Sequence, residues 1–402
     1  MKTSYVALGA SLLRNLCRAA TALALTSLLP FTPAKAEYVL TELTMPGATS
    51  VTLWDVNNVG TMVGSSTQGT GPGNYSQGFI YDGTSFTTLS GPAGSISNSA
   101  LGISDTGIVV GSFYSSATTD PGTGEVTFGP SVGFVYSGGS YTAFSIAGAN
   151  DTFLRGISAD GRYWSGYYST AAVAGIGFVY DSLIGTLHNL SAPNSVSTIA
   201  QGINGAGIVV GSDILTGSPI TRPGFRYDIA TGTRTDESIP GADRTALRSI
   251  DDAGRVAGWF RDTGQLTHGF VGSVTSYEQI DFTGADSTFV EGSNNAGVLV
   301  GNFTLVPGES NHAFIATPVD DPAVLLSELA SDVVGVGSGK SLANKMALAE
   351  AYYDANDIPA TCAVLADFVR EVAAQAGKKL TATQAATLTS DASSIMAAIG
   401  CD

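Results

Sequence analysis

A ten-residue pattern recurs six times along this chain and constrains its fold more than any other feature. One copy, residues 202–211, reads as a short strand ending in Gly-Ile, a polar turn containing Gly207, and an apolar strand ending in glycine. This is the pattern of a tight β-hairpin, and its turn glycine is expected at a positive φ, where a side chain would clash. The equivalent turn glycines, separated by 47, 54, 46, 47 and 43 residues, are Gly60, Gly107, Gly161, Gly207, Gly254 and Gly297. A period of this length, with about four short strands per unit, is typical of a β-propeller blade.

Four repeats also contain a third strand with the pattern Gly-Phe-x-Tyr, at residues 78–81, 133–136, 177–180 and 224–227, and a fourth strand follows, as in residues 141–144. The chain after residue 36 begins with a fourth strand, residues 38–43, and the last repeat ends with a third, residues 313–315. The N-terminal strand can therefore complete the last unit and leave no open sheet edge. We predict a mainly β fold: a six-bladed propeller closed by the N-terminal strand, with a β-solenoid or another blade count as the alternatives.

The two ends of the chain differ from the repeats. Residues 1–36 have a basic start, an apolar core and a small-x-small site at Ala34-Lys35-Ala36, which together predict a secretory signal peptide cleaved near Ala36. The alternative, an uncleaved anchor, is disfavoured by the short apolar core. Residues 37–318 form the predicted propeller, and residues 319–402, rich in Ala and Leu, a small α-helical bundle.

Four helices are expected in this bundle, over residues 321–333, 341–356, 359–376 and 381–400. Thr381 and Gln384 form a capping-box pattern at the start of the fourth helix. Only Cys362 and Cys401 remain after cleavage, and two cysteines in an exported chain can pair as a disulfide.

The net negative charge of the chain argues against some classes of binding partner. Cleavage removes four of the 18 basic residues and no acidic one, so 18 − 4 = 14 basic and 34 acidic residues remain, a net charge of −20. Such a surface repels nucleic acid and anionic lipid. It is compatible with neutral glycans or cationic partners, although acidity also simply keeps exported proteins soluble.

No cofactor, metal ion or catalytic residue is predicted. Of the three histidines, His188, His268 and His312, the last two occupy equivalent repeat positions, which indicates a structural hydrogen bond at the start of the third strand. Residues 335–341 look like a phosphate-binding loop, but Val334 stands where the motif needs glycine, so a helix linker is expected. No pair of carboxylates stands out for glycoside cleavage.

Recurring aspartates have structural interpretations. Asp105, Asp160 and Asp252 lie in the hairpin turns, where aspartate usually accepts hydrogen bonds from its own turn. Asp243 and Asp286 recur after the fourth strand and are also expected to be structural.

At one position of the repeat the chemical type of the residue changes from one repeat to the next. The residue before the Gly-Ile pair is Trp54, Leu101, Arg155, Gln201, Arg248 or Glu291. The first strand of a propeller blade lies nearest the axis, so these six side chains should form a ring around a central channel. We predict that Trp54, Arg155, Gln201, Arg248 and Glu291 bind a polar ligand such as a glycan or peptide. The alternative is that they pack between blades or fill the channel with ion pairs.

The repeats resemble a known family. His312-Ala313-Phe314 and His268-Gly269-Phe270, with the Gly-Ile-Asn and Gly-x-Val-Val-Gly elements, are similar to the extracellular HAF-type repeats of bacteria over residues 38–316. The chain departs from that pattern at Gln77, Val132, Ile176 and Pro223, which stand in place of the histidine. The resemblance implies export and a propeller-like fold, and no established reaction.

The C-terminal segment resembles the FIMAH domain, a helical module of bacterial surface proteins, over residues 322–400. The residues that carry this resemblance are Gly339-Lys340-Ser341-Leu342, residues 363–368, and Gly377-Lys378-Lys379-Leu380. It implies an accessory role on the surface or in the medium. The sequence as a whole predicts a secreted, extracellular or periplasmic, non-catalytic binding protein, a monomer with a glycan or cell-surface protein as ligand. The alternative is a secreted polysaccharide hydrolase or lyase.

Overall fold

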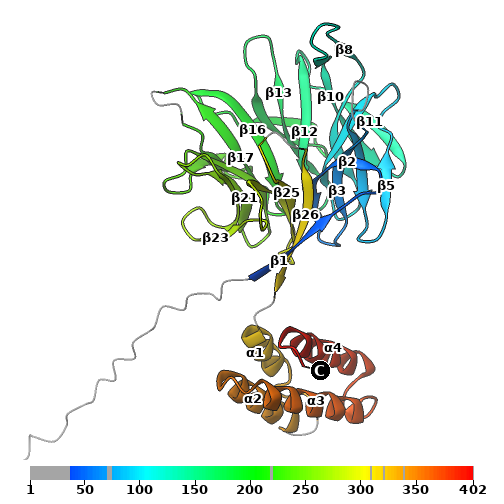
Figure 1. The fold of residues 1–402 in the computed structure, drawn as a ribbon, viewed down its shortest axis with the longest axis vertical. Coiled ribbons are helices and arrows are strands. Elements are labelled where there is room, and N and C mark those ends of the chain that lie inside the picture. The colour runs from blue at the N-terminus through cyan, green and yellow to red at the C-terminus, as the bar shows by residue number, and fades with distance from the viewer. Residues whose placement is uncertain are drawn as a thin grey trace, which may run out of the picture. The chain divides into compact units, whose positions relative to one another are not determined.

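The computed structural model describes residues 37–69, 75–217, 221–307, 310–319, 322–337 and 340–401 (Figure 1). The predicted signal peptide lies outside these residues. The described chain is mainly β, with four α-helices at its C-terminal end (Figure 1). None of its helices is both long enough and apolar enough to cross a membrane.

Most strands fall into antiparallel groups of four that follow the sequence repeats. Four such groups are separate sheets. They are β2 (Ala48–Val56), β3 (Met62–Gln68), β4 (Gln77–Tyr81) and β5 (Phe86–Leu89); β6 (Ser97–Ile103), β7 (Val109–Tyr114), β10 (Ser131–Ser137) and β11 (Ser140–Phe144); β12 (Asp151–Ile157), β13 (Tyr163–Ser169), β14 (Ile176–Asp181) and β15 (Thr186–Asn189); and β16 (Ser195–Ile203), β17 (Ile208–Leu215), β18 (Gly224–Asp228) and β19 (Thr233–Glu237). A small hairpin, β8 (Ala117–Thr119) and β9 (Val126–Phe128), is inserted in the second group.

Two further groups share one sheet because a single parallel bridge, Thr267–Ser287, joins them. They are β20 (Arg244–Ile250), β21 (Val256–Arg261), β22 (Thr267–Gly272) and β23 (Tyr277–Ile280); and β24 (Ser287–Ser293), β25 (Leu299–Thr304), β26 (His312–Val319) and β1 (Glu37–Leu43). Strand β1 pairs antiparallel with β26 along its whole length, from Glu37 opposite Val319 to Leu43 opposite Ala313. The N-terminal strand therefore completes the last group, as the repeat pattern predicted.

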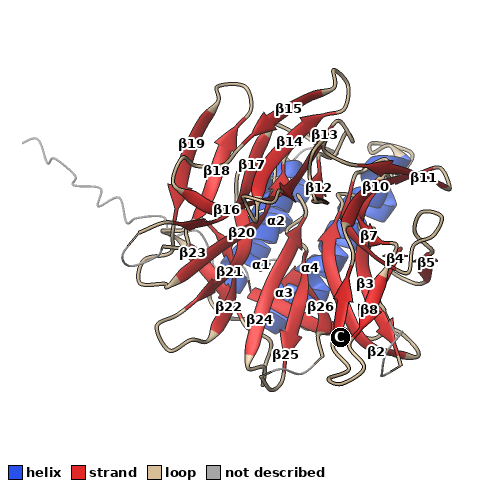
Figure 2. Cartoon of the chain, turned by 90° about the horizontal axis from the view of Figure 1, so that it is seen from above, coloured by secondary structure: helices blue, strands red, loops and turns tan. Residues whose placement is uncertain are grey.

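The groups stand side by side around a common centre (Figure 2). The first strand of each group contacts the first strand of the next, in the order β2, β6, β12, β16, β20, β24, and β24 contacts β2. A side-chain amide secures the contact between the last and first groups, since Asn302 accepts a hydrogen bond from Leu53 N at 2.9 Å and donates to Leu53 O at 3.3 Å. The arrangement is propeller-like.

The repeated motif residues form the core between neighbouring sheets. The phenylalanine of every Gly-Phe-x-Tyr-type third strand is fully buried: Phe79, Phe134, Phe178, Phe225, Phe270 and Phe314. Burying one such ring stabilises the fold by about 1.5–3 kcal/mol. The glycine that follows the apolar residues of the second strand makes room for it, since a Cβ on Gly211 would lie 2.6 Å from the ring of Phe225. The prediction that the second strand ends at this glycine is wrong, because β17 continues to Leu215. The six turn glycines all have a positive φ, between 78° and 85°, as predicted.

The helices are α1 (Pro322–Asp332), α2 (Ser341–Asp354), α3 (Ile358–Gln375) and α4 (Ala382–Ala398). Leu329, Met346, Phe368 and Ile395, one from each helix, belong to one buried cluster. The predicted capping box is present, because Thr381 accepts from Gln384 N and the Gln384 side chain accepts from Thr381 N. Cys362 and Cys401 form a disulfide across a Cα–Cα distance of 5.6 Å, which confirms the predicted pair.

Candidate functional site

The six varying residues identified in the sequence are bulge residues in the structure. In five first strands the pairing register skips one position, between Leu53 and Asp55 in β2 and at the corresponding place in β6, β12, β20 and β24, and in β16 it skips two. The skipped residues are Trp54, Leu101, Arg155, Arg248 and Glu291, and Gln201 together with Gly202 in β16. A β-bulge removes a residue from the ladder and re-aims its side chain. This local irregularity, repeated in every group, is what turns one side chain per group away from the regular sheet faces.

The residue after the bulge meets the neighbouring group at close range. A Cβ on Gly202 would lie 2.8 Å from Arg248 O, and one on Gly292 would lie 2.7 Å from the Cα of Asp55. Glycine at this position therefore permits the close approach of two backbones. Two groups carry a polar residue instead: Ser249 Oγ accepts a hydrogen bond from Ser293 N at 3.1 Å, and Asp55 Oδ2 accepts one from Ile103 N at 3.0 Å.

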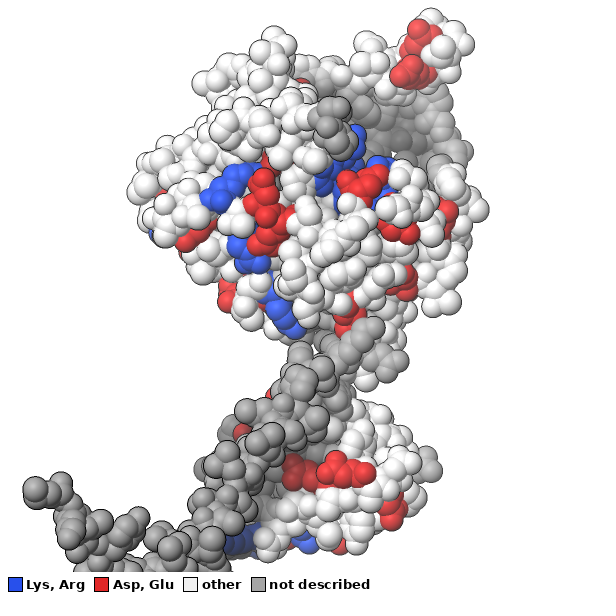
Figure 3. All heavy atoms as spheres, turned by 90° about the vertical axis from the view of Figure 1, so that its left-hand side faces the viewer, with Lys and Arg blue, Asp and Glu red and all other residues white. Residues whose placement is uncertain are grey.

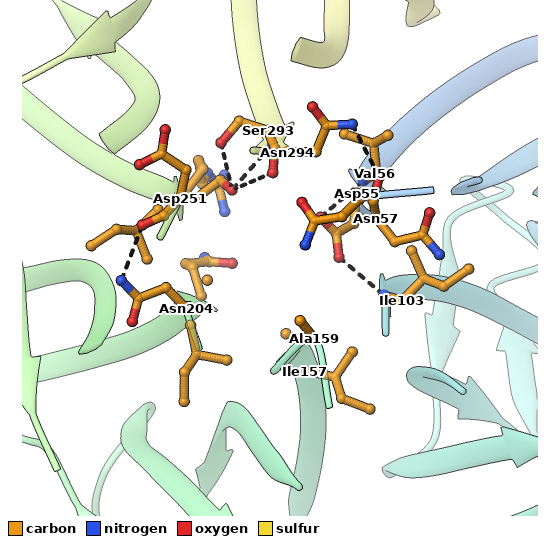
Figure 4. A pocket seen from close by; sticks show the side chains of 18 of the residues that line it. Asp55, Val56, Asn57, Ile103, Ile157, Ala159, Asn204, Asp251, Ser293 and Asn294 are labelled. Carbon is orange, nitrogen blue, oxygen red and sulfur yellow. Dashed lines mark hydrogen bonds between the residues drawn. The ribbon is translucent and has the colours of Figure 1, made fainter. Parts of the chain in front are cut away.

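The bulge residues line one cavity of about 70 Å³. Figure 4 shows this cavity in the centre of the strand groups. All six contribute to its wall, together with Asp55 and polar residues of the hairpin turns. The structure thus brings the predicted ring together. Leu101 and Gln201 are 6% exposed and Glu291 is 8% exposed, while Trp54, Arg155 and Arg248 are partly buried.

Opposite charges meet within the ring. Arg248 Nε lies 3.1 Å from Glu291 Oε2, an ion pair whose side chains are 14% and 7% exposed. Burial lowers the pKa of Arg248 to about 10, and the Glu291 carboxylate offsets part of that loss. Burial raises the pKa of Glu291, against the opposing effect of Arg248 and Arg155. Part of the ring is therefore filled by an ion pair, which was the alternative to ligand binding.

Arg155 has a different environment. Its guanidinium carbon lies 5.4 Å from the centroid of the Trp54 ring, a cation–π contact. Among the described residues no carboxylate forms an ion pair with Arg155. The buried Nε of Arg155 and the buried Nε2 of Gln201 have no hydrogen-bond partner in the described chain. A buried donor without a partner costs roughly 1–3 kcal/mol, so these two atoms are the least satisfied part of the ring.

Asp55 is a cavity residue that the sequence reasoning missed. Its carboxylate accepts hydrogen bonds from Ile103 N, as seen in Figure 4, and from Val56 N at 2.9 Å. Burial raises the pKa of Asp55 to about 7, and the two backbone N–H groups oppose this rise. A comparison of the six repeats could have identified Asp55, because it stands where four of the other five groups have glycine.

The hairpin turns form the rim of the cavity and link the groups. Asn58 N donates to Asp105 Oδ1 at 2.8 Å, Gly205 N donates to Asp252 Oδ1 at 2.8 Å, and Asp252 N donates to Asn295 Oδ1 at 3.0 Å. The expectation that Asp105 and Asp252 accept hydrogen bonds from their own turns is therefore wrong, because backbone N–H groups in the turn of the preceding group donate to both carboxylates. Asp160 does behave as predicted and accepts from Arg162 N of its own turn at 3.0 Å.

The other candidates have structural surroundings. His268 Nδ1 lies 3.0 Å from Asp281 Oδ2, and His312 Nδ1 lies 2.9 Å from Glu42 Oε1, so both histidines hydrogen-bond near the start of a third strand. Asp243 pairs with Arg261 at 2.8 Å, and Asp286 accepts from Ser287 at 3.2 Å. Among the described residues, no three His, Cys, Asp or Glu side chains gather as a metal site.

Two further features bear on anion binding: the glycine-rich segment after α1 and the distribution of charge on the surface. Residues 335–337 follow α1, and α2 begins at Ser341, so the glycine-rich segment joins two helices rather than a strand and a helix; Ser338 and Gly339 lie outside the described residues. The face drawn in Figure 3 shows Lys and Arg interleaved with Asp and Glu, without an extended basic surface.

No known protein family matches the sequence, and no curated protein matches it. Several solved structures are similar in fold. The TolB protein of Acinetobacter baumannii matches with a TM-score of 0.40 and 14% identity over 67% of this chain and 64% of that one, so the match leaves about a third of the TolB chain unmatched. The Penicillium chrysogenum α-L-arabinanase matches with a TM-score of 0.38 and 10% identity over 68% of this chain and 98% of that one. The Aleuria aurantia lectin matches with a TM-score of 0.36 and 14% identity over 61% of this chain and 77% of that one.

Proposed function

We propose that this chain is an exported, non-catalytic binding protein that holds a polar ligand, a glycan in particular, in its central cavity. The observation that carries the proposal is the bulge repeated in all six first strands, which directs one side chain per group into a single cavity. A pocket with a few convergent polar groups is the usual form of a small-ligand site.

The architecture behind this proposal is a six-bladed propeller closed by the N-terminal strand, spanning residues 37–318 and followed by a helical domain, residues 319–402. The proposal keeps the resemblance to HAF-type repeats and to the FIMAH domain, and with it a bacterial surface or secreted role. Export after cleavage near Ala36 agrees with the disulfide between Cys362 and Cys401, because such bonds persist in oxidising compartments.

Binding to an array of neutral and charged glycans tests the proposal. The Arg155→Ala variant should lose ligand retention about tenfold or more, as expected for a buried polar anchor. Arg162→Ala is the matched control, since Arg162 belongs to the same strand group but pairs with Asp181 away from the cavity, at 2.6 Å. Equal binding by wild type and Arg155→Ala, with the same melting temperature for both, would contradict the use of the cavity.

One observation supports the alternative, a polysaccharide hydrolase or lyase. Asp55, with a pKa of about 7, has the proton affinity of a general acid, and it lines the same cavity as Glu291. Against this role, both oxygens of Asp55 already accept backbone hydrogen bonds. Release of reducing ends from a polysaccharide panel, abolished by Asp55→Asn, would favour the enzyme over the binding protein.

A further inference from the structure

We propose that the ring of bulge residues recognises the carboxylate of an acidic sugar, with Arg155 and Gln201 as the groups that bind it. This inference rests on the binding function proposed above and names the class of ligand.

The unsatisfied atoms of the ring are all hydrogen-bond donors. Arg155 Nε and Gln201 Nε2 are buried without a partner in the described chain. Arg248 Nε lies near Glu291 but does not meet the geometry of a hydrogen bond to it. A ligand that satisfies this part of the cavity must therefore present acceptors.

The charge of the ring selects an anionic acceptor. Arg248 and Glu291 neutralise each other at 3.1 Å, which leaves the guanidinium of Arg155 as the excess charge. This positive charge lies inside a chain whose net charge is −16. A carboxylate can accept from the guanidinium of Arg155 and from the amide of Gln201 together, and such charge-assisted bonds are about twice as strong as neutral ones.

The rim of the cavity selects hydroxyl groups. Its side chains include the carboxylates of Asp105 and Asp252, whose oxygens each accept one hydrogen bond from a neighbouring turn and keep further lone pairs for a ligand. A polyanionic peptide would be repelled there, whereas sugar hydroxyls can donate to these oxygens. A sugar acid is the ligand class that has donors for the rim and a carboxylate for Arg155.

The test compares ligands that differ only in the charge of the carboxyl group. Tetrasaccharides containing galacturonate or glucuronate, and their methyl esters, are titrated into the full mature chain by calorimetry. The acid form should bind about tenfold more tightly than its ester, the size of one charge-assisted contact. Arg155→Ala and Gln201→Glu should remove this preference, Arg155→Lys should keep part of it, and Arg162→Ala should leave it unchanged.

Each other outcome overturns a defined part of the reasoning. Equal binding of acid and ester, or a preference that survives Arg155→Ala, refutes carboxylate recognition while leaving glycan binding in place. Acetate or glutamate that competes as well as the sugar acid refutes the role of the sugar. Competition by an acidic peptide refutes it in the same way. Absence of binding for every saccharide refutes both this inference and the proposed function. If Arg155→Ala does not fold, Gln201→Glu with an unchanged melting temperature provides the same comparison.

Discussion

Replacing Asp55 by serine is expected to remove the loss of stability that this one carboxyl group causes as the pH rises from 4 to 8. The pKa of Asp55 is about 7 in the folded chain and 3.8 in the absence of burial. A carboxyl group whose pKa is raised by folding stabilises the folded state fully below its ordinary pKa. This contribution is lost as the pH rises from about 3.8 to about 7, because the unfolded chain releases its proton first.

The size of the effect follows from the shift of the pKa. One unit corresponds to about 1.4 kcal/mol, so a shift of roughly three units sets a ceiling of about 4 kcal/mol on the loss of stability. Asp55 is only partly buried and lines a polar cavity, so solvent screening reduces this to the order of 2 kcal/mol. Serine is the informative replacement, because Ser249 makes the equivalent bond to the next strand without a charge.

Urea unfolding followed by tryptophan fluorescence between pH 4 and pH 8 measures this difference. The fluorescence reports on the strand groups, since the three tryptophans lie between residues 54 and 259. Asp55→Ser should be more stable than wild type at pH 8 by on the order of 2 kcal/mol and equal to it, or slightly less stable, at pH 4.

Asp82→Ser is a control of opposite sign. Asp82 accepts from Thr84 N at 2.9 Å and Ser85 N at 2.8 Å, which lowers the pKa of its carboxyl group. Its stabilisation is present above the ordinary pKa and lost on acidification, so Asp82→Ser should cost more at pH 7 than at pH 3. Parallel pH profiles for wild type and Asp55→Ser would refute the reasoning about Asp55.

Three further substitutions test the architecture. Gly202→Ala places a Cβ 2.8 Å from the backbone of the neighbouring strand and should destabilise by about 2 kcal/mol or more, whereas Gly122→Ala, which meets only a flexible side chain, should be neutral in urea unfolding. Cys362→Ser opens a disulfide with a sequence separation of 39 and should cost about 4 kcal/mol by loop entropy, seen as helix melting by circular dichroism. Asn294→Ala removes a 3.0 Å bond from the last to the first strand group and should cost about 1–3 kcal/mol. No loss in the first and third cases would argue against close contact between neighbouring groups.

Local pattern was enough to predict most of the fold. The hairpin glycines, the third strands and the helix starts depend on backbone conformation within a few residues, and the sequence of that short segment is enough to predict it. The completion of the last group by β1 was also predictable, because the last repeat lacks a fourth strand and the chain after residue 36 begins with one. Cys362 and Cys401 could pair in only one way once the signal peptide was set aside.

The cavity was only partly predictable. Comparing repeats singled out the varying residues, but it did not show that each occupies a bulge, nor that Arg248 pairs with Glu291 while Arg155 faces Trp54. These contacts join residues 43 and 101 positions apart in the chain, so no pattern within one repeat predicts them.

The turn aspartates show the same limit. Sequence alone determined that Asp105 and Asp252 lie in tight turns, where a carboxylate needs a nearby N–H donor. Only the tertiary structure decided which donor they find, since the packing of one strand group against the next brings the preceding turn within 2.8 Å. The raised pKa of Asp55 also depends on the packing of one strand group against the next. Its position in the repeat is local information, but its pKa depends on how the neighbouring strand covers it and on the N–H of Ile103 that the neighbour supplies.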